Sequence, residues 1–453
     1  MTRYDPAALD DTHDPARQSW VTSANDPAGD FPLQNLPWCV LRAEEGARVC
    51  VRIGDRLLPV APVAAAGLLR DGAGRPFEEE LFAGDHLSPA LLSLPPARRR
   101  ALRAALADLL DARASAGTAA AVGAHLREVG ELLTPIRVGD YTDFYASVHH
   151  ATHVGMMLRP EQPLMPNYKW LPVGYHGRAS SVRASGEPVR RPSGQRAPAA
   201  EGEAPSFGPC QMLDYELEVG AVIGRGNDLG APLTLEGAEE ALFGLCLLND
   251  WSARDLQRWE YQPLGPFLAK NFLTTISPYV VTMEALAPFR APLEARPAGD
   301  PAPLPHLRGE LDARAGGVAA RLRVTLSTAR SREAGAPAQR LSEADFRLMY
   351  WSFAQMAAHH TSSGCDLRPG DLLGSGTVSG PTREARGCLL ELTWDGAVGS
   401  PLPTTSRTPI AVEATGEQRR FLLDGDEVTL EGWCERAGAR RVGFGRCVGR
   451  VVG

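Results

Sequence analysis

The sequence predicts a mainly β protein with a small N-terminal domain and a larger C-terminal one. At 453 residues the chain is longer than a single hydrophobic core usually extends. Its 46 glycines and 37 prolines favour many short strands joined by turns over long helices. Near the N-terminus, β-prone runs such as residues 49–53 end at turn signals such as Gly54-Asp55, which predicts a small all-β unit there.

The smaller domain is expected to span residues 1–130 and the larger one residues 131–453. Residues 1 to about 30 are rich in Asp, Pro and Ala with little periodicity, so we expect a loosely ordered arm. After Pro95-Pro96, apolar residues recur at helical spacing and predict a helix: Leu102, Ala105, Leu106, Leu109 and Leu110. The alanine-rich residues 112–124 follow without clear turn signals, which places the domain boundary near residue 130.

The larger domain is predicted to consist of strands, dense in Gly and Pro, and one late helix. Ser342 is expected to cap this helix, and Asp345 completes a start that resembles a capping box. The helix should end before Gly364. Its apolar stripe is formed by Phe346, Met349, Tyr350 and Phe353.

Charge and hydropathy exclude several classes of function. The net charge is −7 with acidic and basic residues well mixed, which gives no electrostatic surface for nucleic acid or for an anionic membrane. The longest apolar stretches, such as residues 241–248, are far shorter than the roughly 20 residues that span a bilayer. Residues 1–20 are acidic and polar, unlike a secretory signal, so we expect a cytoplasmic protein.

Eight cysteines stand singly, without the CxxC pairs of zinc or redox sites. We expect reduced and mostly buried thiols, because a cytosolic compartment disfavours the alternative of disulfides. They are Cys39, Cys50, Cys210, Cys246, Cys365, Cys388, Cys434 and Cys447.

Three polar stretches are the candidates for chemistry. In the first, Asp143 and Tyr145 project to one face if the segment is extended, and His150 lies one short turn away. In the second, Glu216 and Glu218 share one face of an otherwise apolar strand. An ordinary solvated face is the common alternative for such a pair, but a cation would relieve the repulsion between adjacent carboxylates.

The third stretch begins at Asp250, which follows an apolar run and so stands at the expected end of a buried strand. Arg254, Gln257 and Tyr261 then recur at i, i+3 and i+7, so a helix would present all three on one face. The alternative is a polar helix face with salt bridges.

The metal chemistry of these stretches favours hard cations. His149 and His153 have the i, i+4 spacing of a zinc pair, but no Cys or Glu nearby completes the usual pattern. Four carboxylates form a hard oxygen set that suits Mg²⁺ or Ca²⁺: Asp143, Glu216, Glu218 and Asp250. His359 and His360 lie at the end of the late helix, where the helix dipole favours a cationic His, so we expect a structural role for both.

Taken in order, these stretches resemble the fumarylacetoacetase family over almost the whole chain. The matching motifs are DFPLQNLP at 30–37, DYTDFY at 140–145, LPVGYHGRASS at 171–181, NDWSARD at 249–255, PLGPFL at 263–268, RPGDLL at 368–373, GTVSGP at 376–381 and FLLDGDEV at 421–428. The resemblance implies an N-terminal SH3-like barrel, a catalytic domain of rolled β-sheets, and a homodimer. It also implies hydrolysis of a carbon–carbon bond in a β-diketo acid at the end of tyrosine and phenylalanine breakdown.

The resemblance also implies roles for individual residues. Asp143, Glu216, Glu218 and Asp250 match the ligands of Ca²⁺ or Mg²⁺, and Lys270 with Thr274 matches a second, Mg²⁺-binding position. His150 matches the general base and Glu391 its carboxylate partner. Arg254, Gln257 and Lys270 match the groups around the developing oxyanion. The substrate contacts match Tyr145, Arg159, Tyr175, Gln257, Tyr261 and Thr377.

Two positions depart from the family's pattern: Leu273 and His153 each replace a smaller residue. Leu273 bears on the second cation position alone. The nearest alternatives are an acylpyruvate hydrolase or a related decarboxylase or isomerase, which are mostly shorter and lack the N-terminal unit. A non-catalytic metal-binding scaffold is the alternative of another class, and it would predict loss of His150 or Glu391.

Overall fold

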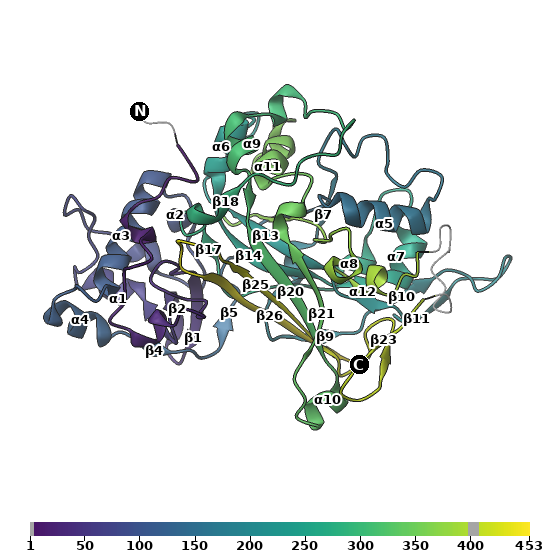
Figure 1. Cartoon of the computed structure of the whole chain (residues 1–453), viewed down its shortest axis with the longest axis horizontal. Coiled ribbons are helices and arrows are strands. Elements are labelled where there is room, and N and C mark those ends of the chain that lie inside the picture. Colours follow the sequence, from purple (N-terminus) through teal and green to yellow (C-terminus); the bar gives the residue numbers. More distant parts are fainter. Residues whose placement is uncertain (1–3, 397–406) are drawn as a thin grey trace.

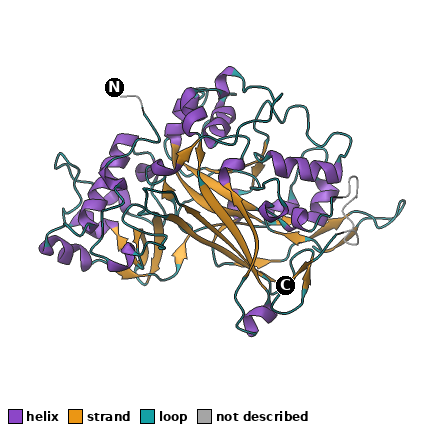
Figure 2. Ribbon diagram, viewed as in Figure 1, coloured by secondary structure: helices purple, strands orange, loops and turns teal. Residues whose placement is uncertain are grey.

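The computed structural model describes residues 4–396 and 407–453. The fold is mixed α/β with more strand than helix, so the mainly β class expected from the sequence holds only in this weaker sense (Figure 2). The N-terminal sheet and its helices lie on one side of the molecule (Figure 1). Larger sheets fill the centre, and helices α5, α7, α8 and α12 gather on the opposite side.

The N-terminal part is a curled antiparallel sheet with helices packed on it. The sheet order is β4 (Arg127–Glu128), β3 (Arg56–Pro59), β2 (Gly46–Ile53), β1 (Trp38–Ala43) and β5 (Leu132–Leu133). The predicted turn at Gly54 joins β2 to β3, and its φ of 52° is a left-handed conformation that glycine tolerates best. The predicted helix is α3 (Pro96–Leu110), and the alanine-rich stretch forms α4 (Ala116–Gly123).

Two large sheets form the centre of the rest of the described chain, beside four two-stranded ones: β10 (Ser193–Arg196) with β11 (Ser206–Pro209), β12 (Leu213–Asp214) with β15 (Ser252–Ala253), β18 (Arg290–Ala291) with β19 (Gly317–Val318), and β23 (Ile410–Ala411) with β24 (Gln418–Arg419). The larger one has the order β7 (Gly174–Gly177), β6 (Tyr141–Phe144), β22 (Leu372–Gly374), β13 (Leu217–Ile223), β14 (Leu242–Asp250), β16 (Thr274–Ile276) and β8 (Val182–Ala184), with β17 (Val281–Thr282) also paired to β14. The second has the order β21 (Gln339–Asp345), β20 (Ala320–Ser327), β25 (Glu427–Cys434), β26 (Val442–Val452) and β9 (Pro188–Arg190).

Alternation along β13 and β14 divides the hydrophobic core in two, because successive side chains of a strand point to opposite faces. One face packs toward the N-terminal part through Val222, Cys246 and Leu248. The other packs toward the second sheet through Val219, Ala221, Leu245 and Leu247. Burial on both faces explains why the sequences of these strands are nearly continuous apolar runs.

The helices nearest the pocket described below are short. They are α5 (Val148–Leu158), α7 (Arg254–Glu260), α8 (Leu268–Asn271) and α12 (Leu389–Leu392). Helices α6 (Leu235–Ala241) and α11 (Phe353–Thr361) pack on each other elsewhere. No helix among the described residues is long and apolar enough to cross a membrane. All eight cysteines are free thiols, and all but Cys365 are buried.

The expected loose N-terminal arm is wrong for residues 4–30, because residues 5–20 contact α3 and residues 23–30 contact the β2–β3 turn and the region before β26. Arg17 is buried and forms ion pairs of 2.7–2.9 Å with three carboxylates, those of Asp11, Asp108 and Asp111. The indole nitrogen of Trp20 donates to the carbonyl of Leu109. Polar contacts with a distant helix leave no periodic signal in the local sequence, so composition alone misjudged this segment.

The start of the late helix was also predicted wrongly. Ser342 lies inside strand β21, which pairs with β20 along most of its length, and the helix α11 begins only at Phe353. Ser352 is its true N-cap, and Gln355 completes the capping box. Pairing with β20 holds Ser342 and Asp345 in the strand. Of the predicted apolar stripe only Phe353 belongs to α11: Phe346 starts a short 3-10 helix (Phe346–Leu348), and Met349 and Tyr350 lie between the two helices. The predicted end before Gly364 is confirmed.

Candidate active site

A cavity of about 530 Å³ opens between the end of the larger sheet and helices α5 and α7. It is lined by eleven of the residues singled out from the sequence: Asp143, Tyr145, His150, Arg159, Tyr175, Glu216, Arg254, Gln257, Tyr261, Lys270 and Thr377. Four others do not line it and are fully or almost fully buried: Glu218, Asp250, Thr274 and Glu391. The sheet and the two helices therefore bring together segments that lie far apart in the sequence.

Four carboxylates converge beside this cavity, and two of them, Asp143 and Glu216, line it. Asp143 lies on β6, Glu216 and Glu218 stand at the start of β13, and Asp250 ends β14. Each offers one oxygen, and these four oxygens all lie within 4.8 Å of one another. Gly374 on the intervening strand β22 makes space for these oxygens, because a Cβ there would lie only 2.6 Å from Asp143 Oδ1.

The four carboxylates of this cluster differ in whether a cationic side chain lies against them. Lys270 Nζ lies 2.6 Å from Glu216 Oε2 and 2.7 Å from Asp250 Oδ2, and Arg254 Nη1 lies 2.7 Å from Glu216 Oε1. Burial alone would raise the pKa of the Glu216 carboxyl, but these two cations hold it below its usual range.

Asp143 and Glu218 have no such cationic partner among the described residues. Burial, together with the charges of the neighbouring carboxylates, raises the pKa of both side chains well above the ordinary value. Within the described part of the chain, Asp143 Oδ1 and Glu218 Oε1 also lack a hydrogen-bond donor. Two orphaned oxygens and excess negative charge fit a divalent cation with a preference for oxygen ligands.

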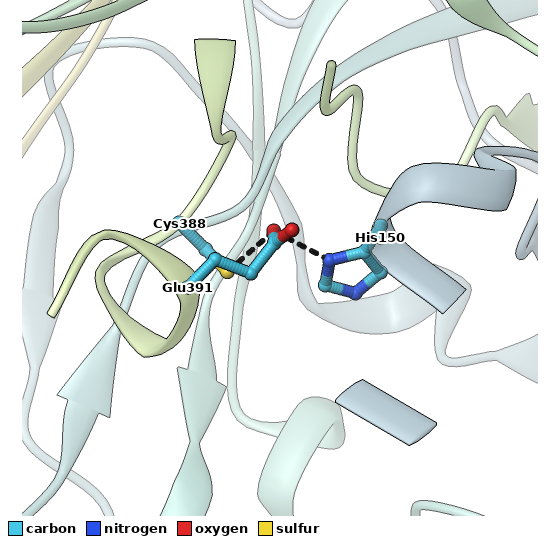
Figure 3. A group of neighbouring side chains, drawn as sticks. All are labelled: His150, Cys388 and Glu391. Atoms are coloured by element: carbon cyan, nitrogen blue, oxygen red, sulfur yellow. Dashed lines mark hydrogen bonds and ion pairs between the residues drawn. The ribbon is translucent and has the colours of Figure 1, made fainter. Parts of the chain in front are cut away.

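A histidine and a glutamate form a second buried unit beside the cluster (Figure 3). The Ser147 hydroxyl caps α5 by accepting from the His150 backbone N–H. The His150 ring places Nδ1 2.7 Å from Glu391 Oε2. The hydroxyl of Ser379 donates to the same carboxylate oxygen at 2.8 Å, and the thiol of Cys388 lies 3.2 Å from it. With Nδ1 bound to Glu391, His150 keeps Nε2 for another partner, as in a base held by a carboxylate.

Comparison with known proteins identifies the family. The family model "Fumarylacetoacetate (FAA) hydrolase C-terminal" matches residues 140–452, and the model "Fumarylacetoacetase N-terminal" matches residues 34–134. The chain belongs to the fumarylacetoacetate hydrolase family. Three similar proteins, each named "Fumarylacetoacetase", come from Caenorhabditis elegans (43% identical; 93% of this chain and 96% of that protein covered), Bos taurus (42%; 96% and 98%) and Homo sapiens (42%; 96% and 98%).

Asp214, a fully buried residue of this fumarylacetoacetate hydrolase site, was not singled out from the sequence. Its carboxylate accepts from Arg254 Nε at 3.0 Å, and it also accepts from the backbone N–H groups of Leu389 and Leu390 at 2.8 and 3.0 Å. It thereby joins α7, which carries Arg254, to α12, which carries Glu391. A signal was present, since Asp214 continues the alternation of Glu216 and Glu218.

The remaining histidines contact different partners in the structure. His149 Nε2 lies 3.7 Å from Glu294, whereas His153 Nδ1 lies 2.7 Å from Glu391 Oε1, so the two rings of the zinc alternative have different partners. His360 Nε2 lies 2.9 Å from the hydroxyl of Thr142 on strand β6. This contact agrees with the structural interpretation of His360.

Proposed function

We propose that this chain hydrolyses fumarylacetoacetate to fumarate and acetoacetate, the last step of tyrosine and phenylalanine catabolism. The observation that carries the proposal is the opening of one cavity onto both the carboxylate cluster and His150. The similarity to fumarylacetoacetases along more than nine-tenths of the chain supports the same reaction. It also disfavours the shorter acylpyruvate hydrolases, and the presence of both His150 and Glu391 disfavours a non-catalytic scaffold.

Asp143, Glu216, Glu218 and Asp250 would hold Ca²⁺ or Mg²⁺ as the cofactor. When bound, the cation supplies a Lewis acid and a template for the two keto oxygens of the substrate. A second, Mg²⁺-binding position beside Lys270 and Thr274 stays a prediction. The Thr274 hydroxyl donates to Asp250 Oδ1 at 3.0 Å, and the Leu273 side chain next to it is almost fully buried.

His150 would act as the general base through Nε2. It takes a proton from water as the water oxygen attacks the carbonyl carbon on the fumaroyl side. The bond between this carbon and the acetoacetate carbon then breaks. Its electron pair leaves with acetoacetate as an enolate, and the proton held by His150 passes to that carbon. Glu391 keeps the imidazole oriented and stabilises its charged form, because its carboxylate already lies against Nδ1.

Arg254, Gln257 and Lys270 would donate to the oxyanion formed by the attack, where the loss of one donor typically costs about 10²–10³ in rate. Arg254 and Gln257 lie next to each other, with Arg254 Nη1 3.1 Å from Gln257 Oε1. Substrate would be bound by the other residues that line the cavity: Tyr145, Arg159, Tyr175, Tyr261 and Thr377. Within the described residues, Arg159 Nε and Thr377 Oγ1 are buried without a partner, so both can donate to a ligand.

The assembly and domain structure belong to the same proposal. The curled N-terminal sheet would be an SH3-like barrel, with the catalytic domain beginning near residue 131. The active form would be a homodimer with a closed two-fold interface. Sedimentation should then give about twice the chain mass of 48.6 kDa. A monomer at micromolar concentration would contradict the dimer while leaving the reaction untouched.

The direct test of the reaction follows the absorbance of fumarylacetoacetate with purified protein. Loss of the absorbance is expected with Ca²⁺ or Mg²⁺ present, and no turnover is expected after treatment with a chelator. An acylpyruvate without the fumaroyl group serves as the control substrate. Faster turnover of this control than of fumarylacetoacetate would favour the acylpyruvate alternative.

A further inference from the structure

We propose that His153 is a positioning residue, which fixes the carboxylate of Glu391 so that Glu391 can orient the base His150. This inference rests on the proposed function of the same site. Its starting point is the environment of Glu391, whose side chain is fully buried and lies against two imidazoles, one on each oxygen. His153 Nδ1 is 2.7 Å from Oε1, and His150 Nδ1 is 2.7 Å from Oε2.

The partners of the two oxygens are distributed unequally. Oε2 accepts from His150 and Ser379 and lies within reach of the Cys388 thiol. Among the contacts of the described residues, Oε1 accepts from His153 alone. A carboxylate can rotate about its last bond, and the hydrogen bond of His153 on Oε1 opposes a rotation that would turn Glu391 away from His150.

The geometry of His153 suits this task. It stands one turn after His150 on α5, so both rings project from the same helix face toward α12. The ring of His153 packs on Trp394 with centroids 5.7 Å apart, and its side chain is only 13% exposed. His153 is therefore held in place on one side by an aromatic ring and on the other by the carboxylate.

The contact also affects the charge of Glu391. Burial alone would raise the pKa of the Glu391 carboxyl, but the charges and hydrogen bonds of His150 and His153 together hold it well below its usual range. An ionised Glu391 is the form that accepts the Nδ1–H of His150 and stabilises the imidazolium. His153 thus supports the base through Glu391 without touching the substrate.

The test compares three substitutions of His153. His153→Leu and His153→Ala remove the donor, whereas His153→Asn places an amide N–H within reach of Oε1. We expect kcat to fall about tenfold or more in Leu and Ala, with KM changed by less than about twofold, because outer-shell hydrogen bonds typically contribute about 10–100-fold. His153→Asn should recover most of the lost kcat.

His149→Leu is the matched control on the same helix, because His149 faces Glu294 and should leave kcat unchanged. Melting temperatures of all variants show whether the fold persists, and His153→Ala serves if His153→Leu does not fold. Wild-type kcat in either His153→Leu or His153→Ala, or equal losses in Asn, Leu and Ala, would overturn the positioning role. Failure of the proposed reaction is distinguishable, since the wild-type protein would then show no turnover in the same assay.

Discussion

The protein contains two buried carboxylate sites that differ in how they are neutralised: Glu391, and the cluster of Asp143, Glu216, Glu218 and Asp250. Both oxygens of Glu391 receive hydrogen bonds from side chains of the chain itself, and its pKa is held well below the ordinary value. Asp143 and Glu218 are equally buried, but each keeps an oxygen without a partner among the described residues, and their pKa is raised. Side chains of the protein satisfy both oxygens of Glu391, whereas the cluster that contains Asp143 and Glu218 keeps uncompensated charge.

This difference assigns the two groups different tasks. A carboxylate that is fully satisfied by the protein holds another side chain in place, as Glu391 holds His150. A group of carboxylates with excess charge is suited to a cation, because a cation relieves their mutual repulsion. The two can therefore be disrupted separately, and the following predictions use that independence.

The largest effect is expected from His150→Ala, which removes the proposed base. Its kcat should fall about 10²–10⁴-fold, the loss that removal of a general base typically causes. Steady-state kinetics on fumarylacetoacetate check this, with His149→Ala as a control that should lose little. Retention of more than about a tenth of the wild-type kcat in His150→Ala would assign the proton transfer to another group.

A smaller loss is expected from Asp214→Asn, because Asp214 links the two groups. The amide keeps one acceptor but loses the charge that pairs with Arg254. Both Arg254 and the start of α12 should then be less well held, with a loss of about 10–100-fold in kcat. Removing one partner of a buried ion pair also destabilises a protein, by about 3–5 kcal/mol. Thermal unfolding in parallel with kinetics measures both effects, and an unchanged kcat would show that Asp214 does not position Arg254 or Glu391.

A third prediction concerns the pH dependence of stability. Since burial and the neighbouring carboxylates raise the pKa of Asp143 and of Glu218, the folded state binds these protons more tightly than the unfolded state does. Their contribution to stability is therefore present at low pH and is lost as pH rises through the raised pKa values. Ca²⁺ requires the ionised carboxylates, so its stabilising effect should grow with pH.

Thermal unfolding with and without Ca²⁺ at several pH values measures this effect. The increase in Tm on adding Ca²⁺ should be larger in mildly alkaline than in mildly acidic buffer. Glu218→Gln removes one of the two raised groups and should weaken the trend. An increase in Tm that is independent of pH would indicate that the cation binds elsewhere.

Much of the site could be predicted from local patterns, and the failures have physical causes. Alternation placed Glu216 and Glu218 together, and helical spacing placed Arg254, Gln257 and Tyr261 on one side of the cavity. Contacts between distant segments leave no such pattern. Arg17 is held by carboxylates on and beside α3, and β21 forms because β20 is there to pair with it.

The same limit applies to the environment of Glu391. Spacing alone gave no reason to pair His150 with Glu391, which is 241 residues away, and that pairing came from the resemblance. The contact of His153 with Glu391 was not expected at all. Only the packing of α12 against α5 brings these side chains together.

The most direct test of the account is the Ca²⁺ content of Glu218→Ala and His150→Ala, measured by equilibrium dialysis beside the wild-type protein. Both variants should be inactive, for different reasons. His150→Ala should retain the wild-type Ca²⁺ content, because all four carboxylates remain, whereas Glu218→Ala should lose it. Equal Ca²⁺ content in the two variants, whether both keep the ion or both lose it, would contradict the division between a cation site and a separate base.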